Sequence, residues 1–406
     1  MSAVVERLRE LAQIGRQEYG IDRALATPAE RAARKWFVTL ARARNYALTQ
    51  DPLGNLFARR DGTRAGAPPI LVGSHLDTVP TGGPYDGAYG VVAALCALEM
   101  LDDRNAQTEH SVEAVAWAGE EGGRFPFGCL GSSAFAGIIE MQRALALVDS
   151  EGTSLAQALA SKEGGLLDDV PARNGTRVAA YLELHVEQGP VLEAEGVVLG
   201  IVTAIAGQRR YRVTVKGESG HAGTVPMAQR SDALCGAADI ILAVERAATA
   251  QEKTVATAGR IAVEPNAPNV IPMRAVFSLD IRSTVDAAID AVESALRDSA
   301  ADVHARRRLH TSIERLESRQ PVPMDPKLRD CIGRAIDSIG QRAINVPSGA
   351  GHDARCLAQI APTAMIFVPS VGGRSHVPDE ETKPEDLEVG VEALAASIAE
   401  ADKFVV

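Results

Sequence analysis

The pattern of apolar and polar positions is of the α/β type from the N-terminus to about residue 206. Short apolar runs such as Ile70–Val72 alternate with helical segments, and residues 90–103 form one with a largely apolar surface. Short apolar runs are typical of buried strands, and an all-round apolar helix is typical of packing against a sheet. Acidic residues and histidines follow several of these runs, where ligand sites of α/β sheets lie.

The pattern changes at Gly207. The segment RYRVTVKGES alternates apolar and polar residues as a half-buried strand does, and two helical segments, residues 231–248 and about 285–302, flank two further strand patterns that end at Asp280. Past about Pro321 the α/β pattern of apolar and polar positions returns. The sequence therefore predicts a discontinuous α/β domain, residues 1–206 and 322–406, with an inserted α+β, ferredoxin-like domain at 207–321.

The composition limits the kinds of binding partner and the cellular location that we expect. The 406 residues carry a formal net charge of -11, which argues against nucleic acid, because phosphate backbones are bound by a surplus of Lys and Arg. Five cysteines without CxxC spacing predict reduced thiols, and no apolar stretch predicts a membrane span. The amphipathic N-terminus is unlike a signal peptide, so we expect a cytoplasmic protein.

The stretch PILVGSHLDTVPTGGPYDGAYGVV, residues 69–92, is interpreted as half of a metal site. Side chains two apart on a strand point the same way, so His75 and Asp77 share a face, where Asp77 can accept the second ring N–H of His75. The glycine-rich turn brings Asp86 back beside His75 as a helix begins near Tyr89. The alternative is a strand, a polar turn and a helix with an incidental histidine.

Further candidate ligands follow other apolar strands. Glu120 and Glu121 come after AVAWAG, His185 lies in AAYLELHV, and His376 follows TAMIFVPS. Each alone is more often an ordinary surface or core residue. A buried carboxylate pair needs cations or a proton to be tolerated, and one member can act as a base while the other binds metal. Mixed imidazole and carboxylate ligands suit zinc, manganese, cobalt or nickel.

Eight motifs carry a resemblance to a known family, in the order GSHLDTVPTGGPYDGAYGV, AWAGEEGGRF, ELHVEQGP, GESGHAGTVPM, NVIP, LDIRS, SGAGHDA and GGRSHVPDE. Over nearly its whole length the chain resembles the two-metal amidohydrolases that include N-carbamoyl-L-amino-acid hydrolase, β-ureidopropionase and allantoate amidohydrolase. These are related to aminoacylase and carboxypeptidase-type zinc hydrolases. The resemblance implies an exopeptidase-like catalytic domain, an inserted lid and dimerisation domain, and two divalent metal ions per subunit.

The resemblance also implies roles for single residues. The metal ligands would be two triads that share one carboxylate, namely His75, Asp86 and His185 for one ion and Asp86, Glu121 and His376 for the other. Catalysis would use Glu120 as general base, with Asp77 supporting His75. Substrate contacts would come from Arg282 and Asn269 to a carboxylate, from His221 to the developing oxyanion in the partner subunit's site, and from Gln188 and Gly351 in the pocket wall.

The implied reaction is cleavage of the C–N bond of an N-carbamoyl amino acid or related ureido acid, giving amino acid, carbon dioxide and ammonia, in a homodimer joined through the inserted domain. An N-acyl-amino-acid deacylase or dipeptidase, or a non-catalytic metal-binding homologue, are the alternatives. Tyr85, Tyr89 and Arg374 depart from the commoner family wording close to the ligands, and we expect them to reshape or charge the pocket. The choice among ureido substrates stays open.

Overall fold

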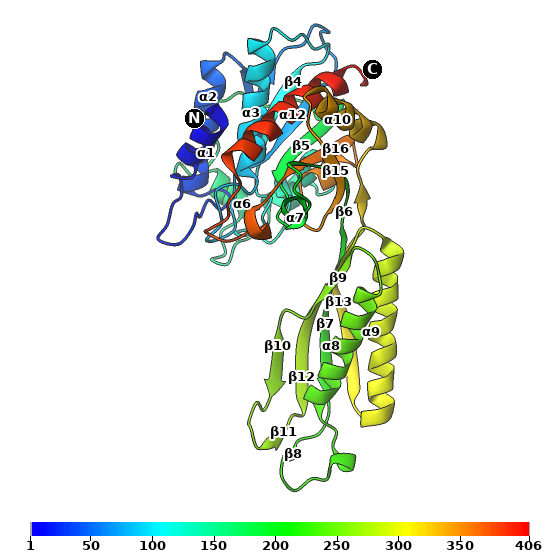
Figure 1. Cartoon of the computed structure of the whole chain (residues 1–406). Helices are drawn as coiled ribbons and strands as arrows, with labels where there is room; N and C mark the ends of the chain where they lie inside the picture. The colour runs from blue at the N-terminus through cyan, green and yellow to red at the C-terminus, as the bar shows by residue number, and fades with distance from the viewer. Residues whose placement is uncertain (1, 406) are drawn as a thin grey trace. The chain divides into compact units, whose positions relative to one another are not determined.

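The computed structural model describes residues 2–405, and their contacts divide the chain into two compact units. The first unit contains the described residues up to Thr203 and from Met324 onwards, and the second contains Ala204–Pro323. The chain leaves the first unit within strand β6, Leu199–Ile205 (Figure 1), and returns after strand β14, Val322–Pro323.

A mixed sheet forms the middle of the first unit. Its strands lie in the order β1, β2, β4, β3, β5, β16 and β6, and β15 also pairs with β6. Strands β4, β3, β5 and β16 are parallel to one another, whereas β1, β2 and β6 join antiparallel. The bounds are β1 Ala47–Gln50, β2 Leu56–Arg60, β3 Ile70–His75, β4 Val112–Trp117, β5 Ala180–Val186, β6 Leu199–Ile205, β15 Ala343–Ser348 and β16 Thr363–Val368.

Helices cover both faces of this sheet. The larger core lies under α1, α2, α3, α10 and α12, while α4, α5 and α6 enclose a smaller apolar cluster and α11 packs on β5 and β16. The bounds are α1 Ala3–Leu11, α2 Pro28–Ala43, α3 Ala88–Asp103, α4 Leu130–Phe135, α5 Met141–Leu145, α6 Leu155–Leu159, α7 Val191–Glu195, α10 Pro326–Ser338, α11 Ala354–Leu357, α12 Pro384–Asp402 and the 3-10 turn η2 Val371–Gly373. Within residues 2–405, no helix is long and apolar enough to cross a membrane.

Burial on both faces explains the sequence pattern. Every residue of β3, β4, β5 and β16 is buried, as expected of parallel strands covered by helices. Helix α3 is buried nearly all round, which confirms the prediction from its apolar surface. Helix α12 approaches α3 closely at Gly390, where a Cβ would overlap the hydroxyl of Tyr89.

The second unit is an antiparallel sheet with helices α8 and α9 on one face (Figure 1). Its strands lie in the order β10, β12, β7 and β13, with β9 also paired to β12, and β8 and β11 form a separate two-stranded ribbon. The bounds are β7 Gly207–Lys216, β8 Gly220–His221, η1 Met227–Gln229, α8 Ala233–Thr249, β9 Thr254–Thr257, β10 Ile261–Glu264, β11 Val270–Ile271, β12 Arg274–Ser283, α9 Asp286–Arg307, β13 His310–Arg319 and β14 Val322–Pro323.

The sequence analysis was wrong about the number of strands in this unit. It predicted two strands between the helices, whereas β9, β10, β11 and β12 lie there, and it did not predict β13 after α9. Strand β13 pairs along β7, and every one of its residues is exposed or half-buried. Because helices cover only one face of the sheet, this edge strand lacks the strong apolar alternation that would have identified it.

Candidate metal centre

Loops that follow the parallel strands of the first unit bring the candidate ligands together. His75 is the last residue of β3, and Asp86 directly precedes the turn into α3. Glu121 lies four residues beyond the end of β4, His185 lies in β5, and His376 follows β16 and η2. Because these strands are parallel, their carboxyl ends meet at one edge of the sheet, where α/β proteins bind ligands.

Asp86 is the centre of this cluster. Its Oδ1 lies 3.6 Å from Nε2 of His75 and 3.3 Å from Nε2 of His185, and its Oδ2 lies 3.1 Å from Nε2 of His376. Oε2 of Glu121 lies 3.7 Å from the same His376 nitrogen. Two groups of three residues have ligand atoms close enough to hold one metal ion each. The first group is His75, Asp86 and His185, and the second is Asp86, Glu121 and His376.

The electrostatics of the cluster fit a cation. Burial and the charges of Asp86 and Glu120 raise the pKa of Glu121 to about 8, because neighbouring carboxylates repel one another. A cation between them would remove this repulsion. The Oε1 atom of Glu121 is buried and has no hydrogen-bond partner. Hydrogen bonding to Asp86 raises the pKa of His376 to about 9, so the surroundings of this imidazole favour positive charge. Asp86 has two imidazoles on one side and an imidazole with a carboxylate on the other, and each of these sets suits a divalent ion.

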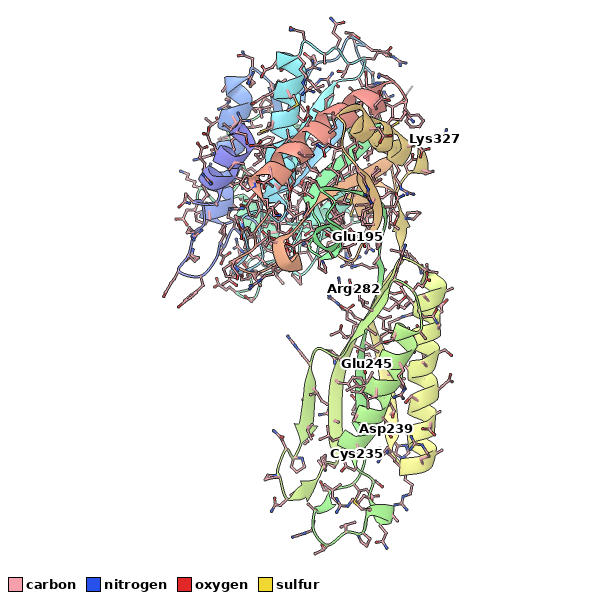
Figure 2. All side chains as sticks on the ribbon, in the orientation of Figure 1. Glu195, Cys235, Asp239, Glu245, Arg282 and Lys327 are labelled. Carbon is pink, nitrogen blue, oxygen red and sulfur yellow. The ribbon has the colours of Figure 1, made fainter. Side chains whose placement is uncertain are left out.

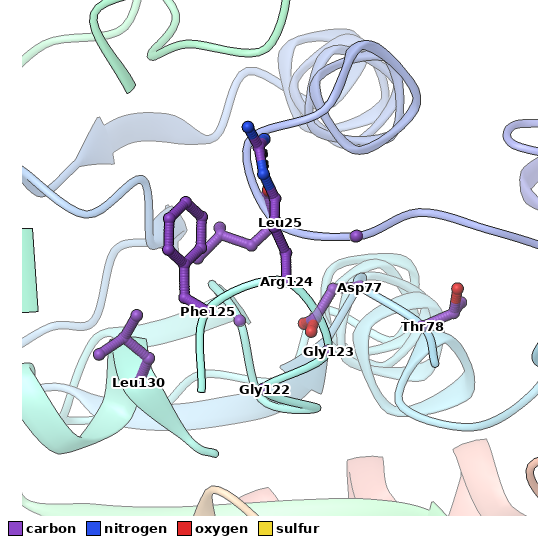
Figure 3. Close-up of a pocket in the computed structure, with 10 residues that line it drawn as sticks. Leu25, Asp77, Thr78, Gly122, Gly123, Arg124, Phe125 and Leu130 are labelled. Carbon is purple, nitrogen blue, oxygen red and sulfur yellow. Dashed lines mark hydrogen bonds between the residues drawn. The ribbon is translucent and has the colours of Figure 1, made fainter. Parts of the chain in front are cut away.

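Asp77 supports the site in a way that differs from the sequence prediction. The ring Nδ1 of His75 lies 3.0 Å from the backbone oxygen of Asp77, not on its carboxylate, which is 3.6 Å away. The carboxylate instead accepts the backbone N–H groups of Glu120 at 3.0 Å and Glu121 at 3.1 Å. Asp77 also lines a small pocket with the loop at Gly122 and Gly123 (Figure 3). One side chain thus ties the end of β3 to the loop after β4.

Glu380 is a supporting residue that the sequence analysis missed. Its Oε2 accepts the backbone N–H groups of Tyr85 at 2.9 Å and Asp86 at 3.1 Å, and its Oε1 accepts the hydroxyl of Ser375 at 2.8 Å. Glu380 therefore joins the Asp86 turn to the loop that carries His376. In the sequence it is one of several acids in HVPDEE, and nothing in that run distinguishes it.

The glycine-rich turn is required by close packing on the candidate ligand His75. Gly87 has a φ of 65°, and a Cβ at this position would clash with the imidazole ring of His75. Its backbone N–H points at Nε2 of His185, 3.1 Å away. Glycine thus allows the main chain to lie between two candidate ligands.

Gln188 and Gly351, which the resemblance assigns to the pocket wall, both lie beside the cluster. The Gln188 amide donates to Oδ2 of Asp86 at 2.7 Å. A side chain at Gly351 would begin 4.0 Å from Oε1 of Glu120. The neighbouring His352 packs edge-on against His185, with ring centroids 4.6 Å apart.

Tyr85, Tyr89 and Arg374, the three residues that differ from those commoner in the family, have different surroundings. The hydroxyl of the fully buried Tyr89 donates to the backbone oxygen of Leu387 in α12 at 2.9 Å, so this side chain packs into the core between two helices. The guanidinium of Arg374 pairs with Asp379 at 2.7 Å, and both side chains are exposed. Tyr85 is half-buried against the larger core.

The candidate substrate residues of the second unit form two separate groups. His221 and Asn269 are neighbours, since Val270 pairs with His221 across β8 and β11, and both are exposed. Arg282 lies near the other end of β12 and binds Asp280 through Nε at 3.0 Å and Nη2 at 3.2 Å (Figure 2). Strand β12 begins at Arg274, and at about 3.3 Å a residue Arg282, eight residues further along it, lies about 26 Å from Arg274. Within one chain, the structure does not bring Asn269 and Arg282 together.

The fold and the ligand cluster are those of an α/β protein with a candidate site for divalent metal at the carboxyl ends of its parallel strands. The model of the peptidase family M20/M25/M40 matches residues 71–400, and the chain belongs to that family. The motif-based prediction of the family and the predicted fold class are thereby confirmed.

Individual relatives show which members of the family this chain is similar to. The chain is 40% identical over 393 residues to the N-carbamoyl-L-amino acid amidohydrolase of Geobacillus stearothermophilus, covering 96% of this chain and 95% of that protein. It is 37% identical over 396 residues to the allantoate amidohydrolase of Bacillus subtilis, covering 97% and 96%. The crystal structure of an amidase of the hydantoinase/carbamoylase family from Burkholderia multivorans matches with a TM-score of 0.93 and 39% identity, over 98% and 97% of the two chains.

Proposed function

We propose that this chain is a metal-dependent amidohydrolase that cleaves the carbamoyl C–N bond of an N-carbamoyl amino acid or related ureido acid. The observation that carries the proposal is the Asp86 carboxylate, which faces His75 and His185 with one oxygen and His376 with the other. The names of the relatives, which cover nearly the whole chain, support the substrate class. The products would be the amino acid, carbon dioxide and ammonia.

Two divalent ions, zinc or alternatively manganese, cobalt or nickel, would be held by the two triads. When bound, they would polarise the carbonyl of the substrate and acidify a water molecule. Asp86 would contribute one oxygen to each triad. Gln188 would orient its carboxylate, and Glu380 would hold its backbone by accepting the N–H group.

Glu120 is the proposed general base. Its Oε2 lies 3.9 Å from Nε2 of His75, so this oxygen faces the ligand cluster. Burial raises the pKa of Glu120, and His75 opposes that shift, which favours a carboxylate that can both take and return a proton. Glu120 would remove a proton from the attacking water and deliver it to the nitrogen that leaves when the C–N bond breaks.

The second unit would supply the substrate contacts. His221 and Asn269 lie together at one end of this unit and Arg282 lies toward the other, so the three would reach one substrate only from two chains. We therefore propose a homodimer joined through this unit, with His221 and Asn269 acting in the partner subunit's site. Arg282 would exchange its contact with Asp280 for the substrate's carboxylate, which a planar guanidinium binds through two N–H groups. The cytoplasmic location stays a prediction.

Ammonia release tests the proposal. Purified protein loaded with manganese or zinc would be assayed on N-carbamoyl-α-amino acids, β-ureidopropionate and allantoate, with N-acetyl and N-formyl amino acids alongside. We expect ammonia from at least one ureido compound and none after treatment with a chelator. Turnover of the acyl compounds alone would instead identify a deacylase, and silence throughout would identify a non-catalytic homologue.

Two variants test the assigned residues. Glu120→Gln should retain the bound metal but lower turnover by about a thousandfold or more, because it removes the proton acceptor. Near-normal turnover would contradict that assignment. Arg282→Ala should lower kcat/KM for substrates that carry a carboxylate, and an equal loss on uncharged amides would count against a carboxylate clamp.

A further inference from the structure

The loop after β4 folds back so that Cys129 lies against Glu120. The backbone N–H groups of residues 129–131 donate to the carbonyl oxygens of residues 118–120, at 2.7 to 3.0 Å. Cys129 itself donates its N–H to the backbone oxygen of Glu120 at 2.7 Å. Its side chain is then aimed at the side chain of Glu120 from the position that precedes α4.

The thiol contacts one oxygen of the Glu120 carboxylate. Sγ of Cys129 lies 3.0 Å from Oε1 of Glu120, and the thiol is almost fully buried. The other oxygen, Oε2, faces the cluster, 3.9 Å from Nε2 of His75. The two oxygens therefore have different surroundings, and only Oε2 is directed at the candidate ligands.

The backbone at Cys129 has a conformation that favours glycine. Its φ is 54°, and a side chain in the left-handed region is sterically disfavoured in L-residues. The hydrogen bonds between residues 129–131 and 118–120 stabilise this conformation. A residue without a Cβ would satisfy the backbone better, so the thiol is present in spite of the local strain.

The surroundings of Cys129 keep its proton in place. The neighbouring thiol of Cys356, then burial, then the charge of Glu120 raise the pKa of Cys129 well above its usual value. A protonated thiol has one hydrogen to donate, and both Cys356 and Glu120 are potential acceptors. A carboxylate is the stronger acceptor because the bond to it is charge-assisted.

We propose that Cys129 is a positioning residue for Glu120, whose S–H holds Oε1 so that Oε2 is the oxygen presented to the attacking water. The proposal rests on the function proposed above, in which Glu120 is the base. In the part of the chain that the structure describes, the thiol interacts with Glu120 and with the thiol of Cys356, and neither residue is a candidate metal ligand. Its effect would therefore lie in the chemical step and not in metal or substrate binding.

Steady-state kinetics of Cys129 variants test the proposal on the substrate that the unmodified protein turns over. Cys129→Ala and Cys129→Gly should lower kcat by about three- to tenfold, the effect of one lost hydrogen bond, with KM and metal content unchanged. Cys129→Ser keeps a donor and should recover most of that loss. Cys129→Gly should in addition be no less stable to heat than Cys129→Ala, because it relieves the left-handed backbone.

Cys356→Ala is the matched control, because it removes a neighbouring buried thiol whose Sγ lies 3.2 Å from the hydroxyl of Ser133. It should leave kcat within about twofold, since no hydrogen bond to Glu120 is lost. Unchanged kcat in Cys129→Ala, a serine variant as slow as the alanine variant, or an equal loss in Cys356→Ala would each overturn the proposal.

A measurement independent of turnover separates this inference from the proposed function. The infrared S–H stretching band that disappears in Cys129→Ala should shift to higher frequency in Glu120→Ala, because the carboxylate acceptor is lost. A band that does not move would overturn the inference even in an active enzyme. A protein silent on all ureido and acyl compounds would refute the proposed function, while the infrared shift would still report the contact.

Discussion

Replacing Asp77 by Asn should weaken metal binding although Asp77 is not itself a ligand. In the structure, the two carboxylate oxygens of Asp77 accept the backbone N–H groups of Glu120 and Glu121, one each. An Asn side chain has one acceptor oxygen and one NH₂ group, so one of the two N–H groups would face another donor. The loop that carries Glu121 would then shift or leave a polar group unpaired.

The size of the effect follows from these contacts. One charge-assisted hydrogen bond is lost at a side chain that is 4% exposed, which predicts a loss of about 2–3 kcal/mol in the free energy of unfolding. Removing a residue that orients metal ligands typically lowers metal affinity or activity by about 10- to 100-fold. We expect both effects in Asp77→Asn.

The two effects need separate assays. The free energy of unfolding would be measured by urea titration of metal-free protein, because a bound metal stabilises the folded state by mass action. Metal affinity would be measured by competition with a chromophoric chelator at fixed pH, since protons compete for the ligands.

Asp51→Asn provides a matched control. Asp51 is also buried, and its carboxylate accepts the backbone N–H groups of Leu53 and Asn55 and the side-chain amide of Asn55, but none of these residues is a candidate ligand. The control should lose comparable stability and keep its metal affinity. Unchanged metal affinity in Asp77→Asn, or an equal loss in Asp51→Asn, would show that the reasoning about Asp77 is mistaken.

Two glycine substitutions give further predictions. Gly87→Ala should lower metal affinity by at least about tenfold, because its Cβ would displace the ring of His75 at a position with positive φ, and metal analysis after dialysis would check this. Gly390→Ala should lower the free energy of unfolding by about 1–3 kcal/mol through overlap with the hydroxyl of Tyr89, and Tyr89→Phe in the same chain should restore part of the loss in a urea titration. Absence of any rescue would point to a different clash.

The sequence identified the parts of the site that depend on strand ends. Apolar runs located β3, β4, β5 and β16, and the polar residues that follow them are the ones that meet in the structure. Because parallel strands end at one edge, knowing the strand order is enough to group their loops. The five candidate ligands could therefore be grouped from the sequence, whereas their division into two triads was implied by the family resemblance and stays a prediction.

Contacts made by backbone groups were not predictable in the same way. Glu380 is important because two N–H groups point at it, and Cys129 because its loop returns along residues 118–120. Neither arrangement leaves a periodic signal, since it depends on how irregular loops close. The separation of Asn269 from Arg282 was also hidden, because two short motifs do not reveal that a long strand lies between them.

The way the second unit is inserted has a consequence for the order of folding. Strands β5 and β16 pair at Tyr181 and Thr363, so their contact closes a loop of about 180 residues. The inserted unit draws on contiguous residues, and Val322 pairs with Ile205 at its two ends. If this unit forms first, the loop left to close shrinks to about 65 residues, which lowers the entropic cost of closure by about 1 kcal/mol. Folding of the inserted unit would thus bring β5 and β16, the two halves of the sheet that carries the candidate ligands, closer together along the chain.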